Sequence, residues 1–181
     1  LKLCVSCKAC RRECPTGVDM ARMKIEVQAA RAAKFELSLH DKLVGFLPHY
    51  APFASNWHHF FNMRDRSALL QKASQLVAGF SASRSLPKWR KDTYRDRSDW
   101  HYTTREENAR AREVVLFADT FNRYFERENL DDALTVLVAG GYRVYPLLPP
   151  GPNDRPLCCG RTFLAIGRVD GQLGGRQRED Q

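Results

Sequence analysis

In the first half of the chain, apolar positions recur at the spacing of amphipathic helices. The pattern predicts a helix from about Asp19 to Lys34, opened by a capping turn at residues 16 to 19. A second, short helix is expected to begin at Ser38 and to be ended by Pro48. A third is expected over residues 65 to 79, with Gly79 as its C-cap.

The segment between the second and third helices, residues 47 to 63, mixes aromatic side chains with two prolines and three histidines. This composition favours an irregular connector whose aromatic rings pack onto neighbouring structure. An alternative also fits the residues, because aromatic rings beside cationic side chains suit the headgroup boundary of a membrane or the surface of a partner. The residues that carry this alternative are Trp57, Phe60, Phe61, Arg64 and Arg66.

The pattern changes class after residue 113. Residues 114 to 119 form a continuous apolar run, which predicts a strand buried on both faces. Helical spacing follows over residues 121 to 139, with a break near Asn129 and an end at Gly140-Gly141, and residues 142 to 148 read as a second strand. The three elements predict a parallel βαβ unit with a right-handed crossover, whose functional loops follow the carboxyl ends of the strands.

Residues 81 to 113 separate the two halves and are polar, charged and almost free of aliphatic side chains. That composition is typical of a solvated linker. Basic residues interleaved with aromatic rings also suit the stacking of nucleic-acid bases, and the rings concerned are Trp89, Tyr94, Trp100 and Tyr102. Acidic residues in the same stretch dilute the positive charge, so we expect a linker and no nucleic-acid partner.

Composition limits the function classes further. The 181 residues carry 29 Lys+Arg against 21 Asp+Glu, and 43% hydrophobic residues are enough for a modest core in one or two domains. The chain has no long apolar run and no signal-like opening, so we expect neither a membrane span nor export. Oxygen-sensitive thiols favour the reducing cytoplasm, with peripheral contact to the inner face of the membrane as an open alternative.

The densest chemistry lies in residues 4 to 15, CVSCKACRRECP, which has the spacing C-x2-C-x2-C-x3-C-P. Disulfides fit poorly, since a disulfide scaffold spreads its cysteines along the chain. Structural zinc usually takes two separated ligand pairs, although zinc or reduced free thiols stay open as alternatives. The spacing is typical of a [4Fe–4S] cluster, and the predicted ligands are Cys4, Cys7, Cys10 and Cys14.

The fourth cysteine of such runs belongs to a neighbouring cluster in two-cluster ferredoxins. We therefore expect Cys14 not to share iron with the other three, because the turn at residues 15 to 17 leads it away from them. The 181 residues contain no second run, and the chain opens with Leu1 rather than Met. These observations predict an upstream segment with a partner run. Lys8, Arg11 and Arg12 are expected to offset part of the cluster's negative charge.

A second thiol pair, Cys158 and Cys159, precedes Gly160 and follows the second predicted strand. Loops at this edge of a parallel sheet collect function, which favours a second redox or metal site. A structural pair in a tight turn before Gly160 is the alternative.

Three stretches together resemble the C-terminal iron–sulfur half of the bacterial FAD-linked oxidases, a family with D-lactate dehydrogenase-like and D-2-hydroxyglutarate dehydrogenase-like members. They are CVSCKACRRECPTGVDMARMKIE, VVLFADTFNRYFERENLDDALTVLVAGGYRVYPL and CCGRTFLAIG. The last part is similar to the cysteine-rich CCG domain of the glycolate oxidase iron–sulfur subunit, of the C subunit of anaerobic glycerol-3-phosphate dehydrogenase and of the B subunit of heterodisulfide reductase. Electron-transfer subunits of those types are the alternative assignment.

The resemblance implies an electron-transfer module with no catalytic residue of its own. Cys4, Cys7, Cys10 and Cys14 would ligate clusters, and Cys158 and Cys159 would form the CCG motif. FAD in an upstream domain or subunit would be reduced by a 2-hydroxy acid, and electrons would pass toward a quinone or cytochrome acceptor. The polar, glycine-rich tail at residues 170 to 181 departs from the family, which implies a truncated CCG domain. A basic nucleic-acid-binding protein with a structural metal is a rival from a different class.

The expected architecture is therefore mixed. A helical, ferredoxin-like [4Fe–4S] segment at residues 1 to 36 precedes a helical connector at 37 to 80. A charged linker at 81 to 112 leads to a partial α/β (βαβ) CCG domain at 113 to 181.

Overall fold

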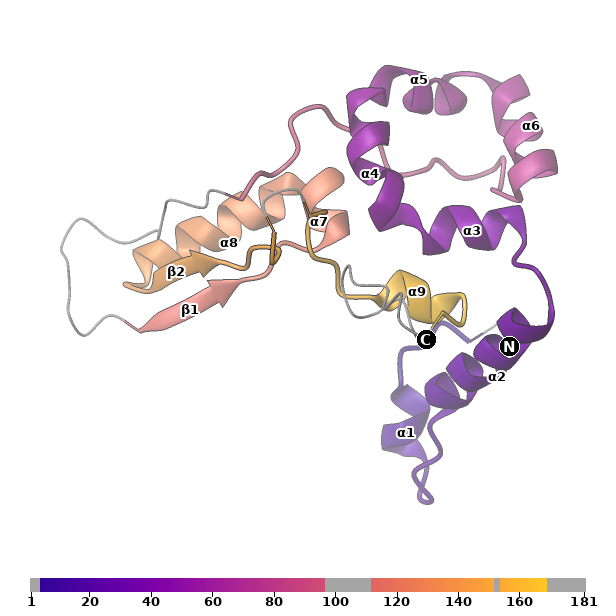
Figure 1. Cartoon of the computed structure of the whole chain (residues 1–181), viewed down its shortest axis with the longest axis horizontal. Helices are drawn as coiled ribbons and strands as arrows, with labels where there is room; N and C mark the ends of the chain where they lie inside the picture. Colours follow the sequence, from indigo (N-terminus) through magenta and orange to yellow (C-terminus); the bar gives the residue numbers. More distant parts are fainter. Residues whose placement is uncertain (1–3, 97–111, 152–153, 169–181) are drawn as a thin grey trace. The chain divides into compact units, whose positions relative to one another are not determined.

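The computed structural model of the chain describes residues 4 to 96, 112 to 151 and 154 to 168. It divides into two compact units, the first comprising Leu1–Leu47 with Gly160–Gly174 and the second Pro48–Cys159 with Gly175–Gln181. Most of the predicted linker beyond residue 96 and the predicted truncation of the tail lie outside the described residues. The elements in chain order (Figure 1) are α1 (Ala9–Glu13), α2 (Met20–Lys34), α3 (Leu39–Gly45), α4 (Leu47–Asn56), α5 (His58–Asn62), the 3-10 helix η1 (Met63–Arg66), α6 (Ala68–Ala78), β1 (Glu113–Leu116), α7 (Thr120–Tyr124), α8 (Arg127–Ala139), β2 (Arg143–Pro146) and α9 (Arg161–Ala165).

Two helices of the first unit begin at side-chain caps, as the sequence predicts. The Asp19 carboxylate accepts a hydrogen bond from the backbone N–H of Arg22 at 2.9 Å, and α2 starts at the next residue. The Ser38 hydroxyl accepts from the N–H of Asp41 at 3.1 Å and opens α3. Each cap satisfies a backbone donor that the first helical turn leaves without an internal partner.

The first unit builds its core from residues distant in sequence. Phe163 of α9 is 1% exposed, and its ring meets the Phe46 ring edge-on at a centroid distance of 5.9 Å. Ile166 packs against the backbone of Gly45, where a Cβ atom would lie 2.2 Å from Cδ1 of Ile166. The C-terminal segment 160 to 168 therefore completes the packing of the helices that follow the cysteine run.

Residues 47 to 63 are helical, which corrects the prediction of an irregular connector. Pro48 does not end α3, which ends at Gly45; it lies in the first turn of α4, where a missing backbone N–H costs nothing. Pro52 lies inside α4 and removes one hydrogen bond there. Ala51 and Ala54 are fully buried, so packing of this face compensates for the lost bond.

The helix predicted over residues 65 to 79 is confirmed in its type and its end. Gly79 caps α6 in the left-handed conformation with φ of 72°. Its first predicted residues instead form the 3-10 helix η1. The apolar face of α6 is exposed among the described residues, since Leu69, Leu76 and Val77 are 81%, 89% and 70% exposed.

The second unit contains the predicted parallel βαβ arrangement. β1 and β2 pair in parallel with Val114 opposite Val144, and α7 and α8 lie between them in sequence. β1 ends at Leu116 rather than at residue 119 and is not buried on both faces, because Val115 is 61% exposed. The described sheet consists of these two strands alone, and no described element covers the face that carries Val115. The helical break falls between α7 and α8 rather than near residue 129.

The described part of the predicted linker is folded onto the second unit. Tyr94 is 5% exposed, and the Trp89 ring packs on Phe125 at a centroid distance of 4.6 Å. The backbone of Tyr94 exchanges hydrogen bonds with Arg123, whose carbonyl accepts from the Tyr94 N–H at 3.0 Å. Trp89 and Tyr94 are thus anchored to the unit rather than solvated, so two of the four rings considered for base stacking already pack against protein. Trp100 and Tyr102 lie outside the described residues.

Candidate metal centre

The loop that carries the first three cysteines holds two residues in a costly backbone conformation. Ser6 and Lys8 have φ of 58° and 62°, and they are the non-glycine residues with positive φ in the described chain. This region costs an ordinary side chain about 1 to 2 kcal/mol, and such residues collect at ligand-binding sites. Ser6 lies between Cys4 and Cys7, and Lys8 lies between Cys7 and Cys10. Left-handed residues in a loop also turn backbone N–H groups toward one concave side, an arrangement that favours anions and iron–sulfur clusters.

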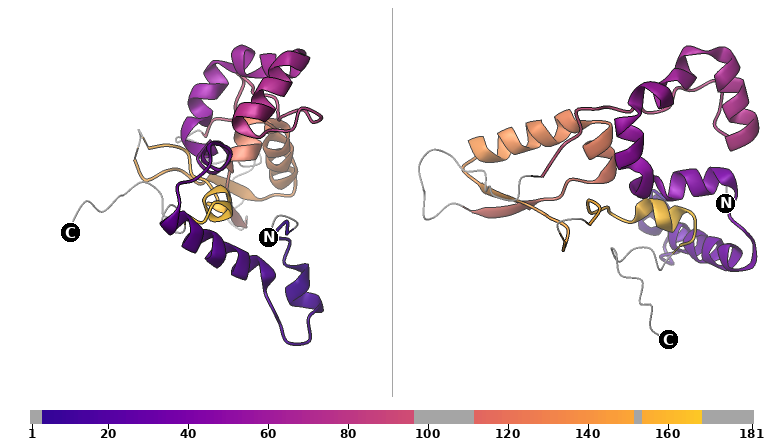
Figure 2. Two further views of the ribbon diagram at one scale, coloured as in Figure 1. Left: turned by 90° about the vertical axis from the view of Figure 1, so that its right-hand side faces the viewer. Right: turned by 45° about the horizontal axis from the view of Figure 1, so that its top comes forward.

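Helices fix both ends of this loop within the first unit. The Lys24 ammonium of α2 donates to the carbonyl oxygen of Cys4 at 2.5 Å. Cys10 lies in α1, and its carbonyl accepts from the N–H of Cys14 at 2.9 Å. The loop and α2 are seen together in the left view of Figure 2. The Lys24 contact spans 20 residues and has no signal in the sequence, so sequence reasoning missed it.

Cys14 has a hydrogen-bonding environment of its own. Its Sγ lies 3.1 Å from Oγ1 of Thr16. A hydrogen bond from the Thr16 side chain, followed by bonds from the backbone N–H groups of Val18 and Thr16, lowers the pKa of the Cys14 thiol. Its neighbouring donors therefore favour the thiolate, the form that binds metal. The turn continues with the N–H of Gly17 donating to the Cys14 carbonyl at 3.0 Å.

The donor set was tested against the predicted cluster in two ways. All four sulfurs of the run are free thiols, half-buried or exposed, and their chemistry suits iron. Over the described ranges, however, no three Cys, His, Asp or Glu side chains gather at metal-binding distances. The residues thus fit the cluster in the type of their donor atoms and in the left-handed backbone conformation of the loop. Convergence of Cys4, Cys7 and Cys10 on one cluster stays a prediction.

Charged side chains of both signs lie near the run, so the expected offset of cluster charge by Lys8, Arg11 and Arg12 stays a prediction. Arg11 approaches the carboxylate of Asp19 at 3.9 Å, while Arg11 and Arg12 both lie in the last turn of α1. Among the described residues, α2 gives the loop little apolar cover. Met20 and Met23 are 43% and 51% exposed, so this helix face does not bury the loop.

The second thiol pair lies in the second unit, close to its boundary. The Arg155 guanidinium donates to Sγ of Cys158 at 3.3 Å, and Cys159 is exposed. Gly160 follows with φ of 71°, a conformation that suits glycine at the start of α9. The structure thus places a cation on one thiol of the pair, a contact that the sequence did not signal. It does not separate the redox or metal role from the structural one.

The aromatic side chains proposed to face a membrane or a partner are partly exposed. Trp57 and Phe60 are 59% and 64% exposed, and Phe61 is 37% exposed. Phe61 also packs on Trp89 at a centroid distance of 6.1 Å, so it supports the fold. Among the described residues, no helix is both long enough and apolar enough to cross a bilayer.

Comparison with known proteins gives distant likeness to one kind of enzyme. The chain is 24% identical over 165 residues to D-2-hydroxyglutarate dehydrogenase of Pseudomonas putida, covering 85% of this chain and 16% of that protein. It is 25% identical over 158 residues to the Escherichia coli enzyme of that name, covering 84% and 15%. The Pantoea ananatis enzyme is 24% identical over 161 residues, with the same coverage as the Escherichia coli protein.

No protein-family model matches the chain, and no solved structure matches it significantly. The chain spans about a sixth of the length of the curated relatives it matches. Its documented similarity is therefore to a short part of larger dehydrogenases.

Proposed function

We propose that this chain is an iron–sulfur electron-transfer module of an FAD-linked 2-hydroxyacid dehydrogenase. The observation that carries the proposal is the run of four cysteines at C-x2-C-x2-C-x3-C-P spacing, with left-handed Ser6 and Lys8 between its first three members. The likeness to D-2-hydroxyglutarate dehydrogenases supports an oxidoreductase setting and a 2-hydroxy acid as the substrate class.

The chain's own residues would position and tune the centre. Cys4, Cys7 and Cys10 would hold a [4Fe–4S] cluster, which supplies one-electron transfer when bound. Lys24 fixes the start of the loop through the Cys4 carbonyl. Lys8 and Arg11 would lower the cost of negative charge near the thiolates. Cys14 would serve a second cluster outside this run, as the fourth cysteine does in two-cluster ferredoxins.

The remaining parts of the proposal concern the larger assembly. FAD in an upstream domain or subunit would oxidise the hydroxy acid, because the proposal assigns no step of that oxidation to residues of this chain. From a module located in the cytoplasm, electrons would leave toward a quinone or cytochrome acceptor. The exposed rings of Trp57 and Phe60 would support a peripheral contact with the inner face of a membrane.

Iron analysis of the full chain, purified without oxygen, tests the module directly. We expect about four iron and four inorganic sulfide per chain, a brown colour, and a paramagnetic signal after reduction. Cys7→Ser should lose most of the iron, because a hydroxyl is a far poorer ligand than a thiolate. Val5→Ser is the matched control, since Val5 lies in the same loop, is 76% exposed and carries no thiol.

Two outcomes would overturn the proposal. One is a colourless protein that binds zinc and no iron under reconstitution with iron and sulfide. The other is equal iron content in the Cys7→Ser and Val5→Ser proteins, which would mean that the loop does not hold the metal.

A further inference from the structure

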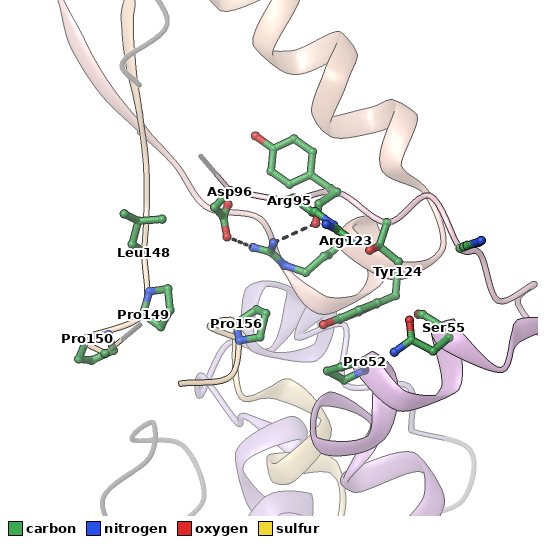
Figure 3. Close-up of a pocket in the computed structure, with 15 residues that line it drawn as sticks. Pro52, Ser55, Arg95, Asp96, Arg123, Tyr124, Leu148, Pro149, Pro150 and Pro156 are labelled. Carbon is green, nitrogen blue, oxygen red and sulfur yellow. Dashed lines mark hydrogen bonds and ion pairs between the residues drawn. The ribbon is translucent and has the colours of Figure 1, made fainter. Parts of the chain in front are cut away.

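A hollow in the second unit combines positive charge with an apolar wall. It has a volume of about 690 Å³ and lies where α4, α7 and the loop after β2 meet residues 91 to 96. Figure 3 shows Arg123 and Asp96 on one part of its wall, with Leu148 and Pro149 from the loop after β2 on another. The carboxyl edge of parallel strands is where open α/β sheets bind ligands.

The charged part of the wall is built from buried groups. Arg123 is 4% exposed, and its guanidinium meets the Asp96 carboxylate at 2.6 Å. It also donates to the carbonyl oxygens of Tyr94 at 3.1 Å and Ala118 at 3.3 Å. These contacts anchor a cation beside the cavity and fix the position of its charge.

Three buried polar atoms of the lining lack hydrogen-bond partners within the described residues. They are Nε of Arg123, Oδ1 of Asp96 and Oγ of Ser55. Each such atom destabilises the fold when it stays unpaired away from water. Native structures keep few of them, and their presence in the lining of one hollow favours a ligand that pairs with them after small side-chain shifts. The hollow leaves room for the small side-chain shifts that this pairing needs.

The formal charge of the lining selects the sign of that ligand. The ionised side chains are those of Lys91, Arg95 and Arg123 against Asp96, so the wall carries an excess of two positive charges. Lys91 and Arg95 are exposed at the hollow and can move onto an anion, while Arg123 is fixed. An inorganic ion would leave the apolar part of the lining unused, where Leu148 lies beside Pro149 and Pro150 of the same loop.

From these features we propose that the hollow binds a small organic anion, with its carboxylate or phosphate group on the arginine side and its carbon skeleton against Leu148 and the prolines. The site lies in a different unit from the cysteine run and does not depend on the proposed cluster. It would give the electron-transfer module a binding site for a small metabolite-sized ligand.

Isothermal titration of the full chain tests the site with three probes: succinate, inorganic phosphate and the neutral diamide succinamide. We expect saturable binding of succinate, of phosphate, or of both, and none of succinamide. The probe that binds more tightly identifies the head group. Saturable binding of neither anion, or equal binding of succinamide, would overturn the proposal.

Variants locate the binding on this hollow. Lys91→Gln with Arg95→Gln should weaken binding of the bound probe about tenfold or more, which corresponds to about 1.4 kcal/mol. The matched control is Arg66→Gln with Lys72→Gln, because both residues are exposed in the same unit and lie outside the lining. It should leave the affinity unchanged.

Leu148→Asp provides a second, independent variant, because it places a like charge at the apolar wall. It should also abolish binding without removing any cation. Equal weakening by the pocket and control pairs would show that net charge alone attracts the anion, and the site would then be rejected.

Discussion

Asn62 and Trp89 exchange two hydrogen bonds across 27 residues of sequence. The Asn62 Nδ2 group donates to the Trp89 carbonyl at 2.8 Å, and the Trp89 N–H donates to Oδ1 of Asn62 at 2.8 Å. One side chain at the end of α5 thus satisfies both backbone groups of a residue in the segment that the composition marked as a linker. This pair explains why a polar segment without regular secondary structure stays on the unit.

Asn62→Ala should therefore destabilise the protein by about 1 to 3 kcal/mol, because it leaves a half-buried N–H and carbonyl without partners. Denaturant unfolding followed by tryptophan fluorescence measures the change. Asn129→Ala is the control, since Asn129 bonds only exposed side chains, and it should cost less than about 0.5 kcal/mol. Equal losses in the two variants would contradict the role given to the Asn62 pair.

Gly167→Ala should be more harmful than Gly141→Ala, although both glycines have φ of 79°. A Cβ at Gly167 would lie 2.3 Å from the backbone carbon of Gln28, whereas nothing lies within 4 Å of one at Gly141. Gly141→Ala should cost only the left-handed strain, about 1 to 2 kcal/mol. Gly167→Ala should cost about 1 to 3 kcal/mol more. Similar melting temperatures would argue against the close contact between the C-terminal segment and α2.

The stability that Arg90 contributes should be lost as the pH falls below about 5. Its hydrogen bonds lower the pKa of Asp92 to about 2 and also lower the pKa of Glu128. A lowered carboxyl pKa contributes stability that is fully present above the unfolded value, about 4, and is lost as the pH falls through the folded value. The advantage of the native protein over Arg90→Gln should therefore be constant above about pH 5 and shrink toward pH 2. A pH-independent difference in unfolding free energy would refute the coupling.

Within the proposed cluster site, Cys14→Ser should differ from Cys7→Ser. If Cys14 serves a second cluster, the serine variant keeps most of the iron that this loop binds, whereas Cys7→Ser loses it. Iron content and the paramagnetic spectrum of the reduced proteins make the comparison. Loss of iron to the same extent in both would place all four sulfurs on one cluster.

The features predicted correctly from the sequence are those set by local chemistry. Asp19 and Ser38 cap helices because their side chains reach N–H groups three residues away. Gly79 ends α6 because the left-handed conformation suits glycine. The cysteine spacing is equally local, and it identified the candidate loop without any knowledge of the fold.

The errors arose where distant residues decide the outcome. Val115 lies in an apolar run, yet it is exposed because the described sheet has no third strand or covering layer on that face. Tyr94 lies in a charged run, yet it is buried because it packs against Arg123 and the residues around it and hydrogen-bonds to the Arg123 backbone. A proline such as Pro48 can either end a helix or lie in the first turn of the next one. Only the packing of the buried alanines that follow, Ala51 and Ala54, decides for the first turn. The left-handed conformation at residues 6 and 8 had no signal in the sequence, because these positions hold Ser and Lys rather than glycine or asparagine.

The first unit is assembled from two ends of a long stretch of chain, and this has a consequence for the order of synthesis. Phe163, Ile166 and Gly167 reach the ribosome exit long after α2 and α3, so the helices beside the cysteine run lack their core partner during most of translation. Closing so long a loop adds only a modest entropic cost, because that cost grows with the logarithm of loop length. The cysteine run would thus be displayed on an open scaffold to whatever delivers metal, and would gain its final support only when residue 168 has been made.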